Sequence, residues 1–165
     1  MSNVIMPPSR IYAPAGNISV FLAGSIDMGQ AVNWQEIVSD MYRGSSVVTI
    51  YNPRRDDWDS SWEQKLECGY FTEQVNWELD FMDKSDFVFL FISKDSKAPI
   101  TLLEFGRITA KYPEKLVICV EPGFWRRGNI EVMCNREGIE LHEDLKGAMI
   151  ELSQRIAHRV QNKLR

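Results

Sequence analysis

The sequence lacks the marks of a membrane protein, of a secreted protein and of a nucleic-acid-binding protein. None of its apolar runs approaches the roughly 18 residues that a membrane span needs. The first 17 residues contain three prolines but no apolar segment like the core of a signal peptide. With 19 basic and 23 acidic side chains, the chain has a net charge of -4 and no basic excess. We therefore expect neither a nucleic acid nor a membrane as a partner.

Cysteine and histidine are scarce as well. The three cysteines, Cys68, Cys119 and Cys134, are odd in number and do not have the spacing of a metal site. Cys119 lies inside an apolar run and is expected in the core. His142 and His158 fall in the last predicted helix, without a metal-type partner, and are interpreted as structural. This pattern indicates a reducing, cytoplasmic compartment and no bound metal.

Motifs for nucleotide cofactors and for common nucleophiles are missing too. The chain has no P-loop, no Gly-x-Gly-x-x-Gly and no visible Ser-His-Asp or Cys-His pairing. Nicotinamide-dependent redox chemistry and phosphoryl transfer therefore have no support, and we expect no cofactor.

Short β-rich runs alternate with helical patterns along the rest of the chain. Strands are expected at about 18–23, 46–51, 86–92 and 116–121, with a weaker one near 137–140. Helices are expected at about 31–43, 70–84, 100–111 and 142–163. Strands that are apolar almost throughout are typical of a parallel sheet covered on both faces. The pattern predicts an α/β fold, a doubly wound parallel sheet in a three-layer sandwich, as one domain over 18–165 after a flexible arm over 1–17.

In such a sheet, ligands bind beyond the carboxyl ends of the strands. The segments that follow those ends are Gly24–Gln30, Asn52–Glu67, Ser93–Pro99 and Glu121–Asn135. A Gly-Ser turn after a strand lets the backbone approach an anion or a sugar hydroxyl. The second segment is long for a strand-to-helix connection and is expected to form a lid or a substrate wall. The candidate binding residues of this rim are Gly24, Ser25, Ile26, Asn52, Arg54, Arg55, Trp58, Ser93 and Asn129.

The charged and aromatic groups of the second segment have two readings. Arg54 and Arg55 follow a strand end and can bind phosphate or carboxylate in a bidentate way. They can equally pair with the aspartates of the same loop and hold it closed. Trp58 and Trp62 can stack on a nucleobase or simply anchor the loop.

Two carboxylates are the candidate catalytic groups. Glu104 lies between apolar residues in the first turns of a helix, where sequences usually keep apolar side chains. Glu78 lies beside the apolar stripe expected on the helix over 70–84, whereas Asp80 is expected to face solvent. Either glutamate can also be an ordinary exposed helix charge. Two carboxylates about 5 Å apart are what retaining glycosyl transfer requires, because one attacks the anomeric carbon and the other handles protons or holds a hydroxyl.

The order of these motifs resembles a known family. Phe21–Ile26, Glu73–Glu78, the Ser85-Asp86 pair before a strand and Leu103–Gly106 resemble the nucleoside 2-deoxyribosyltransferase superfamily. The Asn-Pro-Arg-Arg loop that begins at Asn52 places the chain nearest to its short, deoxyribosyltransferase-like branch. The chain is also similar to the 2'-deoxynucleoside 5'-phosphate N-hydrolases. The resemblance covers about residues 18–121.

The resemblance implies a flavodoxin-like fold and retaining cleavage of an N-glycosidic bond. The family's nucleophile falls on Glu104, and its helix carboxylate, usually Asp, falls on Glu78. Gly24 and Ser25 would bind the 5' end of the sugar or its phosphate. The family often has Asp or Ser six residues before the nucleophile, where this chain has Ala98. The transferases also have a tyrosine in the first strand, where this chain has Val20 or Phe21, so the resemblance favours hydrolysis over transfer. It also implies a homo-oligomer, a dimer or larger.

Three hypotheses for function follow. The first is an enzyme that acts on the N-glycosidic bond of deoxynucleosides or deoxynucleotides as small-molecule substrates. The second is an enzyme of the same fold that acts on another ribosyl substrate such as NAD. The third is a non-catalytic nucleotide-binding module, which needs no ionised Glu104 facing a sugar.

Overall fold

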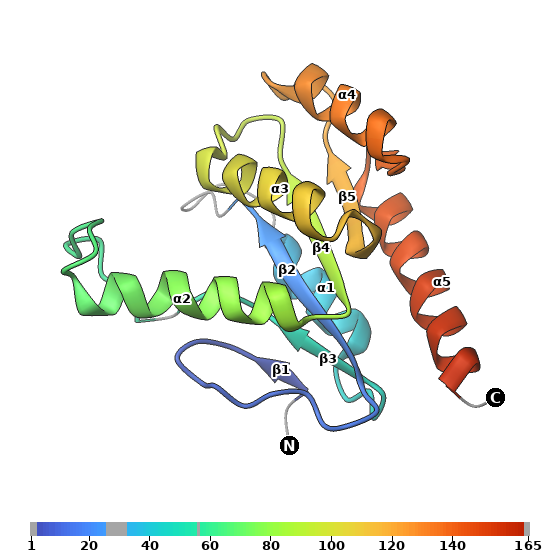
Figure 1. The fold of residues 1–165 in the computed structure, drawn as a ribbon, viewed down its shortest axis with the longest axis horizontal. Coiled ribbons are helices and arrows are strands. Elements are labelled where there is room, and N and C mark those ends of the chain that lie inside the picture. Colours follow the sequence, from blue (N-terminus) through green and yellow to red (C-terminus); the bar gives the residue numbers. More distant parts are fainter. Residues whose placement is uncertain (1–2, 26–32, 56, 164–165) are drawn as a thin grey trace.

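A computed structural model describes residues 3–25, 33–55 and 57–163 of the 165-residue chain. The described residues form a six-stranded sheet in which every neighbouring pair of strands is parallel (Figure 1). The strands are β1 (Val4–Ile5), β2 (Ile18–Gly24), β3 (Val48–Tyr51), β4 (Phe87–Ile92), β5 (Leu116–Val120) and β6 (Leu141–His142). The helices are α1 (Trp34–Tyr42), α2 (Gly69–Lys84), α3 (Pro99–Lys111), the short 3-10 helix η1 (Pro113–Lys115), α4 (Arg127–Glu137) and α5 (Leu145–Lys163).

The strands lie in the order β1-β3-β2-β4-β5-β6. Without the short edge strand β1, this is the order 2-1-3-4-5 of flavodoxin-like folds. The chain leaves β2 toward β3 on one side and later returns to β4 on the other side. The switch point of the sheet is therefore between the carboxyl ends of β2 and β4, where such folds bind their ligands.

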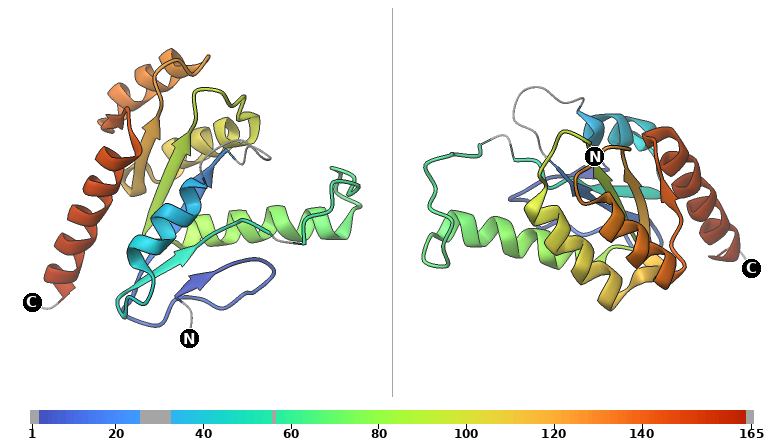
Figure 2. Two further views of the ribbon diagram at one scale, coloured as in Figure 1. Left: turned by 180° about the vertical axis from the view of Figure 1, so that it is seen from behind. Right: turned by 90° about the horizontal axis from the view of Figure 1, so that it is seen from above.

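Two helical layers cover the sheet, as the views in Figure 2 show. Side chains of α2, α3 and α4 form one apolar core with alternate residues of the strands, Phe21, Val88 and Ile118 among them. Side chains of α1 and α5 form the other core with the residues between, such as Val20, Phe89 and Val117. Because both faces of the sheet are buried, its strands are apolar almost throughout. The three-layer, doubly wound fold expected from the sequence is confirmed.

After β5, two elements differ from the sequence expectation. The segment expected as part of a rim loop contains a helix, α4, which buries only Ile130 and Cys134 and therefore has no clear apolar stripe. The position predicted for a weak strand, near 137–140, is wrong. Those residues end α4, where Gly138 adopts a left-handed conformation with a φ of 68°, and the edge strand β6 follows at Leu141–His142.

The N-terminal segment, expected to be a loose arm, contains a strand and packs along the outer edge of the sheet. Val4 and Ile5 pair with Ile50 and Tyr51 of β3. The Tyr12 ring stacks on Phe81 of α2, with 5.0 Å between ring centroids. These contacts join residues far apart in the chain, so local sequence patterns did not indicate them.

The described helices include none that is both long enough and apolar enough to cross a bilayer. Cys119 is fully buried in β5, in the core position expected for it.

Candidate active site

The turn at the end of β2 is held by close packing. A Cβ atom on Gly24 would lie 2.3 Å from the Phe91 carbonyl oxygen and 2.6 Å from Cζ2 of Trp34. The Ser25 N–H donates to the same Phe91 oxygen at 3.3 Å, and the Ser25 carbonyl accepts from Nε1 of Trp34 at 3.1 Å. Only glycine fits between the end of β4 and α1 at this point.

A cavity of about 540 Å³ opens beside this turn, at the switch point of the sheet. It lies between the end of β2, the loop after β4, the start of α3 and one side of α2. Its volume is in the range of small-molecule sites. Its lining consists of residues 22–25, Pro53, Glu78, residues 95–101 and Glu104.

Helix α2 presents Glu78 to the cavity. The helix buries Gln74, Trp77, Phe81 and Met82 against the sheet. A helical spacing of three to four residues predicts a buried stripe of Phe71, Val75, Leu79 and Met82 on this helix. Of these only Met82 is among the buried residues, and Trp77 and Phe81 take the place of the others. Glu78 lies at the edge of this buried face, half-buried.

A hydrogen bond from Gln74 holds the Glu78 carboxylate in place. Nε2 of Gln74 donates to Oε1 of Glu78 at 2.8 Å and to the Pro53 carbonyl at 2.9 Å. Loss of water around the carboxylate raises the pKa of Glu78 to about 7, while the hydrogen bond from Gln74 acts in the opposite direction.

Helix α3 presents Glu104 to the same cavity from its second turn. Phe105 and Ile108, which follow it, are buried in the core beneath the helix. Desolvation and, second to it, repulsion from the Glu78 carboxylate together raise the pKa of Glu104 to about 8. The two carboxyl groups therefore interact directly, and their protons leave as a coupled pair.

Hydrogen-bond donors also line the cavity. Ala98 adopts a left-handed conformation with a φ of 45°, and Pro99 begins α3 directly after it. The N–H groups of Ile100 and Thr101 lie in the first turn, where no carbonyl of the helix can accept from them. The Ser25 hydroxyl is buried and has no partner among the described groups. Such donors suit a hydroxyl or an anion held against the carboxylates.

Of the residues predicted from the sequence, four lie together in the cavity: Gly24, Ser25, Glu78 and Glu104. Ile26 lies outside the described residues. Asn52, Arg54, Arg55, Trp58, Ser93 and Asn129 do not line the cavity. Asn52 is buried, and its Oδ1 accepts from the Arg54 N–H at 3.1 Å. Asn129 is exposed on the first turn of α4.

The loop after β3 is held by its own charges and rings. The Arg55 guanidinium pairs with Asp57 at 2.7 Å and with Glu73 at 3.6 Å, and it lies 5.0 Å from the centroid of the Trp62 ring. Trp62 also contacts Trp58, with 5.0 Å between centroids. Of the two readings for Arg55, the geometry favours the one in which it holds the loop.

The cavity wall over residues 95–101 was only partly anticipated. The segment Ser93–Pro99 was expected at the rim, but no binding role was given to Asp95, Ser96 or Lys97. A signal was available, because Pro99 marks the start of a helix directly after a strand end. Two bonds join this loop to the β5–α4 connection: Lys94 N–H donates to Oε2 of Glu121 at 3.0 Å, and Nε1 of Trp125 donates to the Lys97 carbonyl at 3.3 Å.

His142 was expected in the last helix, and the structure instead places it in β6. Its Nε2 lies 2.5 Å from Oε2 of Glu151. Ligand atoms of Glu140, His142 and Glu151 lie within 4.8 Å of one another, so these three side chains have the types and the spacing that a divalent cation can use. This cluster is on the α5 side of the sheet and shares no residue with the cavity around Glu104.

Comparison with protein families agrees with this geometry. The model of the family described as nucleoside 2-deoxyribosyltransferase like matches residues 17–124, more than half of the chain. The matched region contains the Gly24–Ser25 turn and both cavity carboxylates. A search of curated protein sequences returned no match. The chain therefore belongs to the nucleoside 2-deoxyribosyltransferase-like family.

Proposed function

We propose that the protein cleaves the N-glycosidic bond of 2'-deoxynucleosides or of their 5'-monophosphates, with Glu104 as the nucleophile. The observation that carries this proposal is the pair of desolvated carboxylates, Glu78 and Glu104, in one cavity at the switch point of the sheet. Membership in a deoxyribosyltransferase-like family supports the same chemistry.

The reaction we propose has two displacements at the same carbon. The ionised Glu104 carboxylate attacks C1' of the sugar, the C1'–N bond breaks, and the base leaves with the electron pair and takes a proton from Glu78. A glutamyl ester of the sugar results. Water then attacks C1', Glu78 accepts its proton, and the free sugar and the Glu104 carboxylate are released.

The pKa of Glu104, about 8, is higher than that of Glu78, about 7, so the single proton of the free pair lies mainly on Glu104, and the reactive form, with the proton on Glu78, is the minor one of the two singly protonated forms. The first step needs one ionised and one protonated carboxyl group. Between about pH 7 and pH 8, the interacting pair passes through a state with one proton and one negative charge. We therefore expect kcat/KM to be bell-shaped with pH and greatest in this range. At lower pH, Glu104 is protonated and cannot attack, and at higher pH, Glu78 has lost the proton that the leaving base needs. A rate that is constant from pH 5 to pH 9 would contradict this assignment.

The decisive experiment is base release by wild type and Glu104→Gln. The protein is incubated with deoxynucleosides, their monophosphates and NAD, and free base is measured by chromatography. The variant keeps the shape of the side chain but loses its charge, so turnover should fall at least about 10³-fold. Glu67→Gln, a change of the same chemistry at an exposed loop position, serves as the control and should retain turnover.

Mass spectrometry tests the intermediate. A substrate whose substituted deoxyribose leaves the enzyme slowly should add one sugar mass to Glu104 of the wild type and nothing to the variant. If Glu104→Gln turns over like the wild type, the glycosidic reading is wrong and a nucleotide-binding module is the better account. If only NAD releases its base, the same-fold enzyme on another ribosyl substrate is the right reading.

We also propose a homo-oligomer in the cytoplasm. The assembly is supported by a group of exposed apolar side chains at the outer end of α2 and in its preceding loop, where Trp58 is 38%, Tyr70 61% and Leu66 79% exposed. Sedimentation of the wild type and of Leu66→Ser tests the assembly. A monomeric wild type would contradict it.

A further inference from the structure

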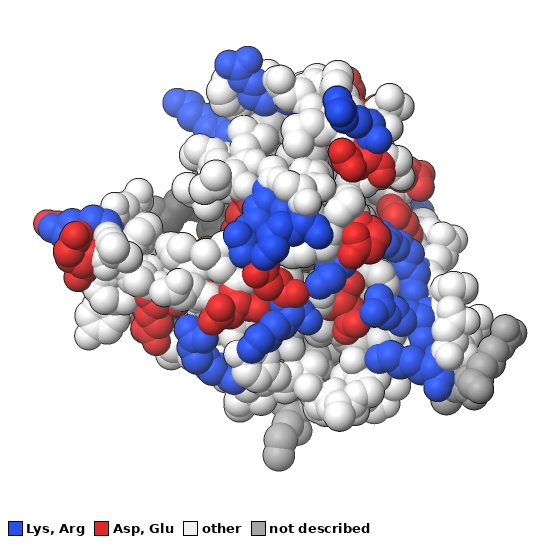
Figure 3. Space-filling view, in the orientation of Figure 1, with Lys and Arg blue, Asp and Glu red and all other residues white. Residues whose placement is uncertain are grey.

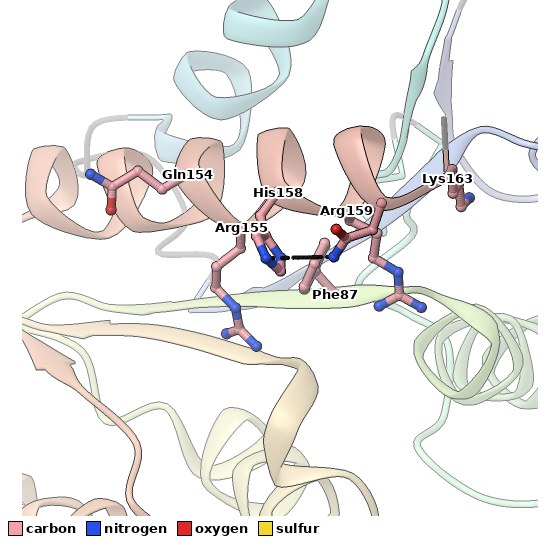
Figure 4. A pocket seen from close by; sticks show the side chains of 7 residues that line it. Phe87, Gln154, Arg155, His158, Arg159 and Lys163 are labelled. Atoms are coloured by element: carbon pink, nitrogen blue, oxygen red, sulfur yellow. Dashed lines mark hydrogen bonds between the residues drawn. The ribbon is translucent and has the colours of Figure 1, made fainter. Parts of the chain in front are cut away.

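A second cavity, of about 530 Å³, lies at the opposite end of the strands from Glu104, between α5 and the first residue of β4. We refer to it as the α5 pocket. Figure 4 shows Arg155 and Arg159 reaching from the helix toward the sheet on either side of Phe87. The pocket is lined by Phe87, Gln154, Arg155, His158, Arg159, Asn162 and Lys163.

The lining of the α5 pocket has basic side chains but no acidic ones. All six polar side chains carry N–H groups that can donate, and no carboxylate lines the pocket. Arg155, Arg159 and Lys163 are four residues apart along one face of α5, and like charges at this spacing destabilise a helix. A chain with a net charge of -4 has thus gathered three cations around one hollow. Glu151 lies 3.5 Å from the Arg155 guanidinium and Asp86 lies 3.2 Å from that of Arg159, so part of this positive charge is already balanced within the protein, and an anion in the pocket would offset the rest.

The arginines are held in place before any ligand binds. The guanidinium groups of Arg155 and Arg159 lie 5.1 Å and 5.6 Å from the centroid of the Phe87 ring. Arg155 donates to the carbonyls of Leu116 and Glu114, so most of its hydrogen-bonding capacity is used within the protein. Arg155 therefore contributes mainly charge and shape.

Arg159 and Lys163 retain donors for a ligand. Arg159 pairs with Oδ1 of Asp86 at 3.2 Å, and this one contact leaves other guanidinium N–H groups available. Nζ of Lys163 donates to the Gly16 carbonyl at 3.2 Å, and no carboxylate of the described residues pairs with it. Guanidinium and ammonium groups on successive turns of one helix, both lining the same pocket, are the donor types that proteins use to bind a phosphate group.

We propose that the α5 pocket binds the phosphate group of a small molecule, with Arg159 and Lys163 as the main contacts. The volume accommodates a mononucleotide as well as free phosphate. A long nucleic acid would need a continuous basic track. Figure 3 shows basic side chains along the inner side of α5 but a mixture of basic and acidic groups over α2 and α3. This site shares no residue with the Glu104 cavity, so it does not depend on the proposed function.

Calorimetric titration at constant ionic strength tests the proposal, with inorganic phosphate, pyrophosphate and adenosine 5'-monophosphate as probes. Arg159→Gln and Lys163→Gln should each raise Kd about tenfold or more for the probe that binds best. Arg136→Gln removes the same charge from an exposed position on α4 and should leave Kd unchanged. Asp86→Asn removes the carboxylate that competes for Arg159 while keeping an oxygen for Ser19, and should tighten binding severalfold.

Amide chemical shifts locate the bound probe. The proposal requires the largest changes at residues 154–163 and at Phe87. Equal affinity in wild type and both α5 variants, or changes centred on Gly24 and Glu104, would overturn it. Tighter binding of a single-stranded 20-mer than of pyrophosphate, lost in Arg159→Gln, would overturn the small-molecule assignment in favour of nucleic acid. Preference for adenosine 5'-monophosphate over inorganic phosphate identifies nucleotides as the source of the phosphate group.

Discussion

Replacing Glu104 by Gln should stabilise the protein at high pH, and the size of the effect follows from its pKa. Desolvation and the neighbouring Glu78 raise the pKa of Glu104 from an ordinary 4.5 to about 8, so the folded state favours the protonated acid. The stability that the acid contributes is complete below about pH 4.5 and is lost as the pH rises through about 8. Glutamine has nearly the shape of the protonated acid and does not ionise. The variant should therefore lose no stability over this interval from position 104.

The magnitude has an upper limit. Each pKa unit corresponds to about 1.4 kcal/mol, so a rise from 4.5 to about 8 corresponds to at most about 5 kcal/mol. Glu104 is half-buried and faces a cavity that water can enter, so we expect about 2 kcal/mol. For a domain of this size, this difference is roughly 4 to 8 °C in melting temperature.

The assay is thermal unfolding of wild type, Glu104→Gln and the control Glu67→Gln at pH 5, 7 and 9. The melting temperatures of wild type and Glu104→Gln should nearly coincide at pH 5 and separate toward pH 9, with the variant higher. The exposed control should follow the wild type throughout. A variant that is less stable than the wild type at pH 9, or a difference that does not change with pH, would refute a desolvated carboxyl at this position.

Three further predictions concern the turn and the substrate. Gly24→Ala should lower the free energy of unfolding by about 1–3 kcal/mol, because its Cβ would lie 2.3 Å from the Phe91 oxygen. Gly106→Ala in α3, with no atom within 4 Å of the added Cβ, should raise the free energy of unfolding by up to about 1 kcal/mol. Urea denaturation measures both. Arg54→Ala should reduce turnover of monophosphates roughly 10- to 150-fold more than that of nucleosides if Arg54 binds a 5'-phosphate, whereas equal losses would indicate a role in the loop. Deoxynucleosides should release base faster than ribonucleosides, because a ribose 2'-hydroxyl would crowd Glu104 beneath C1'; the opposite order in a chromatographic assay would contradict this.

The four central strands and their common rim were predictable from the sequence. Buried parallel strands leave a strong local signal, because every residue of β4, from Phe87 to Ile92, is covered on both faces. The place of Glu104 in the cavity was also predictable from its immediate neighbours in the sequence. A carboxylate among apolar neighbours at the start of a helix is unusual enough to be noticed in the sequence alone.

Other elements have no such local signal. Strand β1 has two residues and exists through its pairing with β3. Helix α4 buries only two side chains, so its polar sequence does not distinguish it from a loop. On α2, the buried face runs through Trp77 and Phe81, and only contact with the sheet selects it over the alternative stripe of Val75 and Leu79.

The tertiary structure alone decided which rim residues meet. The sequence placed Arg55 and Glu104 at the same edge of the sheet, since both follow strand ends. In the folded chain, Arg55 is bound by Asp57, Glu73 and Trp62, whereas Glu78 and Glu104 face one cavity from two different helices. Their distance in sequence carries no information about this, because the rotation of each helix is set by what it packs against. The repulsion that helps to raise the pKa of Glu104 is therefore a property of the packed helices and not of either segment by itself.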